Sequence, residues 1–376
     1  MMFVVLAPTL RAQPASFPPA FEVRVPKAPT VMHGGGQTIL PYELHITNFS
    51  NQPITLQKIE VFAADAVGAG PTLASSAVPL LTLSDSGLMR SLARPGMRVP
   101  PGERVHIAPG LRAVAYMWVP VSGTAPKGIR HRLTATADTG TAGPLVLETP
   151  AVPVSNDLIV ITSPLKGSGW LAANGPSAQS GHRRAMIPLS GSFYIAQRFA
   201  IDWVKLDPRN KTFTGDSLKN SSYYAYSNNA LAVADGIVTE VKDGIPENVP
   251  GLNSRAVPIT LETVGGNHVI IDIGGGHYAF YAHLQPRSIR VKLGDHVKRG
   301  QVLGLVGNSG NSTEPHLHFH ITDASSPLGA EGIPYAFETL YVIGECKSLG
   351  DACTMAATPT VRRLSLPVEN EIVRFP

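Results

Sequence analysis

Residues 315–321 read Pro-His-Leu-His-Phe-His-Ile, a run in which every second residue is a histidine. Successive side chains of a β-strand point to opposite faces, so this alternation predicts a strand with His316, His318 and His320 on one face. Neutral imidazole is the commonest metal ligand in proteins and titrates near physiological pH. The stretch therefore predicts a β-strand with a metal site or a proton-transfer site; the alternative is a solvated histidine-rich strand without a function.

Short apolar runs separated by glycine turns surround this strand in the C-terminal half. Further strands are expected within 231–241, 268–273, 277–284 and 291–307. This series leaves no room for long helices and indicates a compact antiparallel β-fold. Seven of the twelve histidines fall between His268 and His320, and this enrichment indicates a site in this half.

The N-terminal half has its own pattern of short strands. Alternating apolar runs with Pro and Gly corners occur at 44–47, 54–61, 104–107, 113–119 and 131–136. Their spacing predicts an immunoglobulin-like β-sandwich over residues 22–155, so the chain as a whole is expected to be all-β. The scattered histidines of this half, which lie in unrelated segments, are expected to be surface or hydrogen-bonded residues. We expect this half to be a spacer or a binding module.

The composition limits the class of protein. Of the 376 residues, 15% are charged and 43% are hydrophobic, with 36 glycines and 33 prolines, which is typical of a β-rich chain of two or three domains. The net charge of +4, without a long basic run, does not suggest a nucleic-acid partner. No run of about 18 apolar residues occurs, which argues against a membrane span.

Both ends of the chain bear on its location. Residues 1–21 contain a short apolar run followed by Arg-Ala-Gln-Pro-Ala, which is typical of the end of a secretory signal, and we expect a truncated leader there. Cys346 and Cys353, the only cysteines, open a C-terminal extension at 346–376. In an exported chain they could form a disulfide; otherwise they are free thiols. We expect an exported protein, periplasmic or extracellular.

A turn at residues 189–192 separates two runs that are expected to be extended, 183–188 and 193–202. A hairpin about this turn would place His182 opposite Arg198. Arg198 and Asp202 lie four residues apart in the second run and would share one face of it. This register brings an imidazole toward a carboxylate. Residues 207–229 have little periodicity and are expected to form a long surface loop over the site.

Five motifs of the C-terminal half occur in a characteristic order. They are Val-Ala-Asp-Gly-Ile-Val at 233–238, Tyr-Ala-His-Leu at 281–284, Gly-Asp-His-Val-Lys-Arg-Gly-Gln at 294–301, Gly-Asn-Ser-Gly-Asn-Ser at 307–312 and Pro-His-Leu-His-Phe at 315–319. Together they resemble the lysostaphin-type (LytM-like) zinc metalloendopeptidases, which cut peptidoglycan cross-bridges. The resemblance covers about residues 160–340 and implies a metallopeptidase domain at 160–345, a zinc ion and a substrate in the peptide part of the bacterial cell wall.

The resemblance also implies roles for single residues. The family holds zinc with a His-x-x-x-Asp motif and the second histidine of His-x-His, which makes Asp202 and His318 ligands and makes His283 and His316 the catalytic histidines. The first histidine of the motif falls on Arg198, whose guanidinium has no lone pair to donate. His182, from the paired run, is the expected replacement, and it would restore three ligands with one open position for water.

Other interpretations remain open. If the site is degenerate, the domain would be a non-catalytic module that binds peptidoglycan or activates a hydrolase. The pattern at 294–307 also occurs in lipoyl and biotinyl carrier domains, which would leave the histidine cluster unexplained. His320 stands where the family usually has glutamate; we expect a residue at the rim of the site, with support of a ligand as the alternative. The remaining histidines of this half, His268, His277 and His296, are expected to be structural or exposed.

Overall fold

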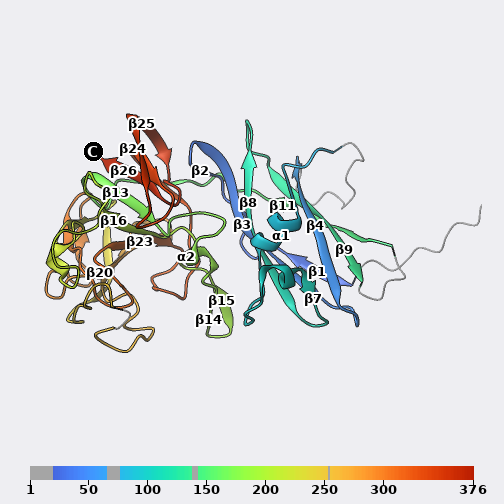
Figure 1. The fold of residues 1–376 in the computed structure, drawn as a ribbon, viewed down its shortest axis with the longest axis horizontal. Coiled ribbons are helices and arrows are strands. Elements are labelled where there is room, and N and C mark those ends of the chain that lie inside the picture. Colours follow the sequence, from blue (N-terminus) through green and yellow to red (C-terminus); the bar gives the residue numbers. More distant parts are fainter. Residues whose placement is uncertain (1–19, 66–76, 138–142, 253–254) are drawn as a thin grey trace, which may run out of the picture.

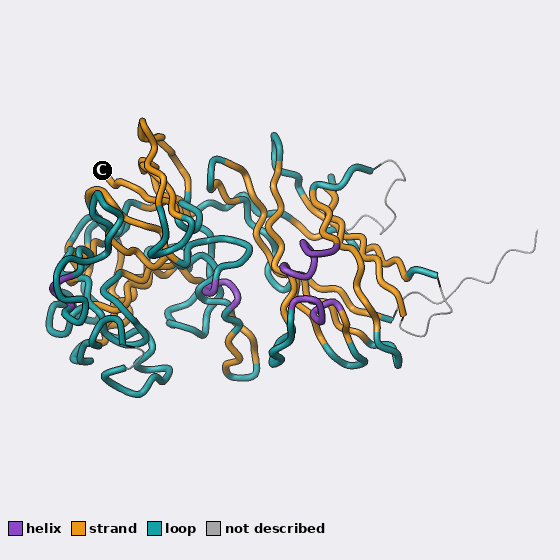
Figure 2. Tube along the Cα trace, in the orientation of Figure 1, coloured by secondary structure: helices purple, strands orange, loops and turns teal. Residues whose placement is uncertain are grey.

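The protein has two β-rich halves, which lie side by side in the computed structural model (Figure 1). The structure describes residues 20–65, 77–137, 143–252 and 255–376. Residues 1–19 of the leader expected at 1–21 therefore lie outside the described residues. Strands and loops make up almost all of these residues (Figure 2), and the α-helices among them are short: α1 (Asp85–Ser91) and α2 (Gly181–Arg184). The expected all-β class is confirmed.

The N-terminal half consists of two antiparallel sheets. One contains β1 (Phe21–Arg24), β2 (Met32–Gly34), β3 (Gln37–Asn48), β6 (Leu92–Ala93) and β8 (Arg112–Val121). The other contains β4 (Ile54–Ala64), β5 (Leu81–Ser84), β7 (His106–Ile107), β9 (Gly128–Ala137), β10 (Leu145–Glu148) and β11 (Val152–Pro153). Alternate apolar side chains of both sheets, such as Leu44 and Ile59, form one buried core. The half is therefore a β-sandwich, and its immunoglobulin-like type stays a prediction.

One expected strand of the sandwich is only partly correct. Residues 104–107 were predicted as a strand, but Arg104 lies in a 3-10 helix, η1 (Pro101–Val105), and only His106 and Ile107 pair in β7. The helix begins at Pro101, because proline has the backbone φ of a helix and needs no hydrogen-bond partner for its nitrogen.

The C-terminal half is built on a sheet of eleven strands. Its order is β12 (Ile159–Ile161), β24 (Tyr335–Cys346), β26 (Glu371–Phe375), β13 (Gly167–Ala173), β16 (Ile201–Lys205), β23 (Leu317–Thr322), β20 (Tyr278–Leu284), β19 (Asn267–Asp272), β18 (Gly236–Lys242) and β21 (His296–Val297), with β25 (Cys353–Ser365) paired to β24. The pairings are antiparallel apart from β12 with β24. Two small two-stranded sheets lie outside this sheet. One is the hairpin of β14 (Ile187–Leu189) and β15 (Ser192–Tyr194), and the other pairs β17 (Asn229–Leu231) with the distant β22 (Val302–Leu305).

Strand β23 lies near the middle of the large sheet, between β16 and β20. Leu317, Phe319 and Ile321 are fully buried in the main core, so the intervening His318 and His320 share the opposite face, as predicted. His316 lies one residue before the strand. The alternation of histidines with apolar residues is thus explained by a strand that is buried on both faces.

The hairpin at 183–202 is shorter than predicted. Strands β14 and β15 pair Ile187 with Tyr194 across a turn at Ser190 and Gly191, but α2 precedes β14 and a turn at 196–199 interrupts the chain before β16. The predicted register of His182 opposite Arg198 is therefore wrong. The interruption has a tertiary cause, because Ile195 leaves the hairpin to pack on Val114 of the N-terminal sandwich.

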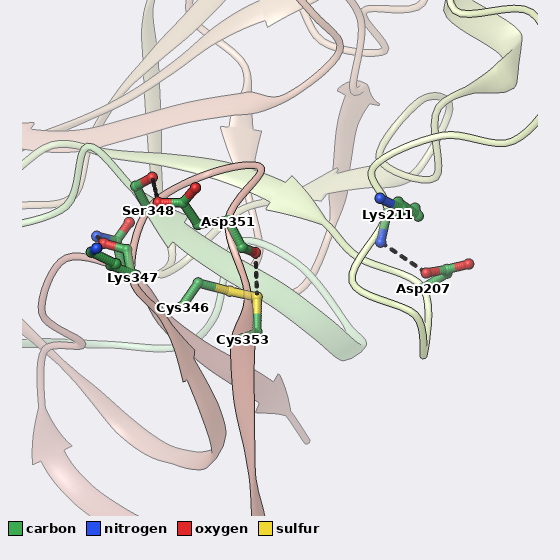
Figure 3. Close-up of a disulfide and its surroundings, with 8 residues drawn as sticks. Asp207, Lys211, Cys346, Lys347, Ser348, Asp351 and Cys353 are labelled. Carbon is green, nitrogen blue, oxygen red and sulfur yellow. Dashed lines mark hydrogen bonds between the residues drawn. A yellow bond between two sulfur atoms is a disulfide. The ribbon is translucent and has the colours of Figure 1, made fainter.

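The C-terminal residues complete the large sheet. Strand β26 lies between β24 and β13, and a disulfide joins Cys346 at the end of β24 to Cys353 at the start of β25 (Figure 3). Of the two outcomes that the sequence left open, the disulfide is the one found. Residues 207–228 form loops and turns with one 3-10 helix, η2 (Asn220–Ser222), as predicted, and β17 begins at Asn229. None of these residues lines the cavity of the candidate site, so the expected position over the site stays a prediction.

Candidate metal centre

Three side chains from separate elements of the C-terminal half converge on one point. His182 comes from α2, Asp202 from β16 and His318 from β23, and their ligand atoms lie within 4.8 Å of one another. The pairing of β16 with β23 sets Asp202 opposite His318, and the Asp202 Oδ1 to His318 Nδ1 distance is 2.8 Å. His182 Nε2 lies 3.3 Å from Asp202 Oδ2. The structure thus brings together the three ligands predicted from the sequence, although His182 arrives from a short helix and not from a paired strand.

The chemistry of this donor set fits zinc. Two imidazoles and one carboxylate are the protein ligands of known hydrolytic zinc sites, which keep a further position open. All three side chains line one cavity of about 270 Å³, together with His283 and His316. A small ion at this point would therefore be reached from the cavity that the two predicted catalytic histidines also line.

Arg198 points away from the cluster. It lies in the turn before β16, its Nε donates to Glu43 Oε2 at 2.8 Å, and its guanidinium also pairs with Glu331. The expectation that Arg198 and Asp202 share one face of an extended strand is wrong, because the chain turns between them. The charge of Arg198 is neutralised in the protein interior and does not occupy the candidate metal centre.

His283 lies on β20 and has its imidazole fixed by the backbone. Its Nδ1 donates to the carbonyl oxygen of Ser309 at 2.8 Å, which leaves the Nε2 lone pair available. Burial lowers the pKa of His283 well below its usual value, and the neighbouring His316 and His318 lower it further. His283 is therefore expected to be neutral at neutral pH and able to accept a proton at Nε2.

His316 has the same kind of backbone anchor but a different charge environment. Its Nδ1 donates to the carbonyl oxygen of Glu314 at 2.8 Å, and its Nε2 lies 3.3 Å from Asp202 Oδ1. Burial lowers the pKa of His316, but the Asp202 carboxylate together with the backbone carbonyl and carboxyl group of Glu314 more than offsets this, so the pKa is raised. The rings of His283 and His316 lie 4.8 Å apart between centroids, so the two imidazoles form a pair beside the candidate ligands.

Asp202 is held as a carboxylate by its neighbours. Burial raises its pKa, but His182, His316 and His318 together lower it more strongly, and the net pKa is well below the usual value. Asn174, in the turn after β13, donates from Nδ2 to Asp202 Oδ2 at 2.8 Å, and its carbonyl oxygen accepts from His182 Nδ1 at 3.0 Å. Sequence reasoning missed Asn174. The only signal was the Asn-Gly pair at 174–175, which indicates a turn but no side-chain contact.

His320 is not a rim residue. It is fully buried, and its Nδ1 lies 2.9 Å from His318 Nε2, so it contacts the nitrogen of His318 that faces away from Asp202. This contact fixes the ring of His318 and corresponds to the supporting role that the sequence left as the alternative. His268 is structural as predicted, with hydrogen bonds to Gly266 and Glu240.

Comparison with known proteins identifies the family of the segment that carries these histidines. Residues 222–329 match Peptidase family M23. The matched segment includes His283, His316 and His318 but begins after His182 and Asp202. Among the described residues, no helix combines the length and apolarity needed to cross a membrane.

Curated relatives match over short segments. Lysostaphin of Staphylococcus staphylolyticus is 39% identical over 74 residues, 19% of this chain and 15% of that protein. Peptidoglycan DD-endopeptidase ShyA of Vibrio cholerae serotype O1 is 43% identical over 65 residues, 17% of this chain and 15% of that protein. The chain thus spans about 15% of the length of these relatives.

Solved structures overlap with larger parts of the chain at low similarity. A mutant of the catalytic domain of the prophage-encoded M23 protein EnpA from Enterococcus faecalis has a TM-score of 0.27 and 23% identity, covering 46% of this chain and 93% of that one. A zinc-containing peptidase from Vibrio cholerae has a TM-score of 0.24 and 15% identity, covering 80% and 81%.

Proposed function

Since its C-terminal domain belongs to the lysostaphin-type peptidases of family M23, we propose that this protein is a zinc-dependent endopeptidase that hydrolyses peptide bonds in bacterial peptidoglycan. One observation carries the proposal: His182, Asp202 and His318 converge on the cavity that also holds His283 and His316. An abandoned site has no physical need to keep all five side chains together.

His182, Asp202 and His318 would hold the ion. When bound, zinc would supply Lewis-acid polarisation of the scissile carbonyl and would make water more acidic. His318 is fixed by His320 and Asp202 is fixed by Asn174, so these ligands are oriented before the ion arrives.

His283 and His316 would carry out the proton chemistry. Each donates its Nδ1 proton to a backbone carbonyl, so each uses Nε2 toward the cavity. One of the two would accept a proton from the attacking water, and the other would donate a hydrogen bond to the negative charge that develops on the carbonyl oxygen. The rings of His283 and His316 are close enough for both side chains to reach the same scissile carbonyl.

The substrate and the location are proposed together. Relatives that match this domain are named as lysostaphin and as peptidoglycan DD-endopeptidases, which supports the peptide part of peptidoglycan as the substrate class. The Cys346–Cys353 disulfide supports an exported protein, periplasmic or extracellular, because disulfides persist in oxidising compartments.

The proposal is tested with the purified protein by measuring bound zinc and the release of soluble muropeptides from isolated peptidoglycan. We expect one zinc per chain and fragment release, and His182→Ala should abolish both. His296→Ala is the matched control, because His296 is exposed and outside the cavity, and it should keep both. Full zinc in His182→Ala would refute the ligand set. Bound zinc without fragment release would favour the non-catalytic binding or activating module.

A further inference from the structure

Two segments that carry candidate ligands are attached to a single carboxylate of the other half. Arg183, next to His182 in α2, donates from Nε to Glu43 Oε1 at 2.9 Å. Arg198, four residues before Asp202, donates from Nε to Glu43 Oε2 at 2.8 Å. Glu43 lies on β3 of the N-terminal sandwich. Figure 1 shows α2 at the junction of the two halves.

This contact is buried and well connected. The exposed fractions are 3% for Glu43, 0% for Arg183 and 5% for Arg198. Arg183 Nη2 also donates to the carbonyl oxygens of Tyr42 and Met117, at 2.7 and 2.8 Å, so its guanidinium is fixed to β3 and β8. Charge-assisted hydrogen bonds are stronger than neutral ones, and a charge left unpaired in the interior is strongly unfavourable. The N-terminal sandwich therefore helps to fix the position of α2, in addition to the hydrogen bond from His182 Nδ1 to the carbonyl oxygen of Asn174.

Helix α2 has little stability of its own. It has only four residues, and no side chain caps its N-terminus. A single helical turn is unstable in isolation, because its nucleation costs more than its few hydrogen bonds return. Asp202 and His318, in contrast, lie on neighbouring paired strands. Of the three candidate ligands, His182 thus depends most on a contact outside its own segment.

We propose that Glu43 is a positioning residue of the metal centre: through Arg183 it holds His182 in place, so the N-terminal sandwich is part of the structure that binds the ion. The inference rests on the proposed zinc site. It gives the N-terminal half a role that neither a spacer nor a separate binding module would have. Arg198, at the position where the family has a ligand, serves instead as the second partner of Glu43 and fixes the approach to Asp202.

The test uses the full chain with Glu43→Gln and measures zinc affinity by competition with a chromophoric chelator. Loss of a residue that orients a metal ligand typically weakens metal binding by roughly 10- to 100-fold, and we expect a loss in this range. In the zinc-free protein, amide hydrogen exchange across residues 181–186 should become faster. This second measurement does not depend on the ion.

Arg183→Met is the second variant, because it leaves Glu43 paired with Arg198 and so remains informative if Glu43→Gln does not fold. It should reproduce both effects. Lys27→Met is the matched control, since it removes another ion pair between the halves, Lys27 Nζ to Asp323 Oδ2 at 2.9 Å. Asp323 follows the end of β23, and the pair contacts neither α2 nor Arg198. The control should bind zinc as the wild type does.

The outcomes separate the two proposals. Failure of the wild-type protein to bind zinc would overturn the proposed function, while hydrogen exchange would still decide whether Glu43 anchors α2. A folded Glu43→Gln or Arg183→Met protein with wild-type zinc affinity would overturn the positioning role. Equal losses in Lys27→Met would also overturn it, because any contact between the halves would then have the same effect.

Discussion

His283 and His316 are chemically identical side chains in different electrostatic surroundings. Both are anchored through Nδ1 to a backbone carbonyl, but only His316 lies beside the Asp202 carboxylate. Neither belongs to the candidate ligand set. The structure therefore separates residues that would act on the substrate from residues that would hold the ion.

Substitution of either catalytic candidate should separate activity from metal binding. We expect His283→Ala and His316→Ala each to lower the rate of muropeptide release by about 10²- to 10⁴-fold, the usual contribution of a positioned acid or base. Zinc content should stay near one per chain, as measured by elemental analysis. Loss of zinc together with activity in His283→Ala would assign that residue to the ligands instead.

A buried histidine of the N-terminal sandwich should make stability depend on pH. His131 is fully buried between Tyr42 and Thr149, and burial lowers its pKa from 6.5 to about 3. As pH falls below 6.5 the unfolded chain takes up a proton on His131 that the folded chain does not, so stability present above pH 6.5 is lost progressively toward pH 3. The slope is about 1.4 kcal/mol per pH unit.

Replacement of this histidine tests that slope. His131→Gln keeps a polar side chain but cannot titrate, so the stability advantage of the wild type over the variant should shrink by about 2–3 kcal/mol between pH 7.5 and pH 4.5. Denaturant unfolding of both proteins at the two pH values measures it. A constant difference between the two proteins would show that His131 does not contribute.

The sequence located most of the candidate site but not its supports. The ordered motifs contain His283, His316 and His318, and the His-x-x-x-Asp motif of the resembled family pointed to Asp202, because each of these signals is local in the sequence. The prediction that His182 lies beside Asp202 is correct, but it was based on a hairpin register that the structure does not have. Asn174 and Glu43 could not be found, because their roles depend on tertiary contacts between segments that are 28 residues apart in one case and 140 in the other.

At the scale of elements, alternation predicted β23 well because a single strand's faces are set by local sequence. The prediction of one continuous strand over residues 193–202 is wrong, because Ile195 packs against the N-terminal sandwich and Arg198 pairs with Glu43 there. The local sequence pattern likewise does not predict that β26 lies between β24 and β13. Pairing between segments that are distant in sequence fixes these elements.

The disulfide between β24 and β25 should stabilise the fold without taking part in the site. The two cysteines are separated by 7 positions, and neither lines the cavity. Because a short closed loop restricts the unfolded chain only moderately, we expect the double variant Cys346→Ser/Cys353→Ser to be less stable by about 2 kcal/mol. Thermal unfolding and zinc content measure this; an unchanged midpoint, or lost zinc, would contradict it.

At the scale of the whole molecule, the two halves share a core. Met32 and Ile39 come from the N-terminal sandwich but are buried in the same cluster as Leu366 and the large sheet. The amide of Leu366 donates to the carbonyl oxygen of His33 at 2.8 Å. The halves are therefore joined by apolar packing and backbone hydrogen bonds as well as by Glu43.

Truncation within this shared core should loosen both halves. Ile39→Ala is expected to lower the free energy of unfolding by about 2–4 kcal/mol, because a buried large side chain is replaced by a cavity. Hydrogen exchange should become faster both in β3 and around residue 366. Val361→Ala, at a half-exposed position, is the control and should change little. Faster exchange confined to β3 would argue against a shared core.

The buried carboxylate of Glu43 also limits how the chain could have evolved. Grafting the C-terminal half onto an unrelated N-terminal module would remove Glu43, the carboxylate partner of Arg183, and would leave Arg198 with Glu331 alone. A buried charge that loses its partner typically costs about 3–5 kcal/mol. Replacing Arg198 by histidine alone would remove one of the two cations that neutralise Glu43. The two halves are thus expected to be inherited together, and a single substitution of Arg198 by histidine is expected to lower the stability of the fold.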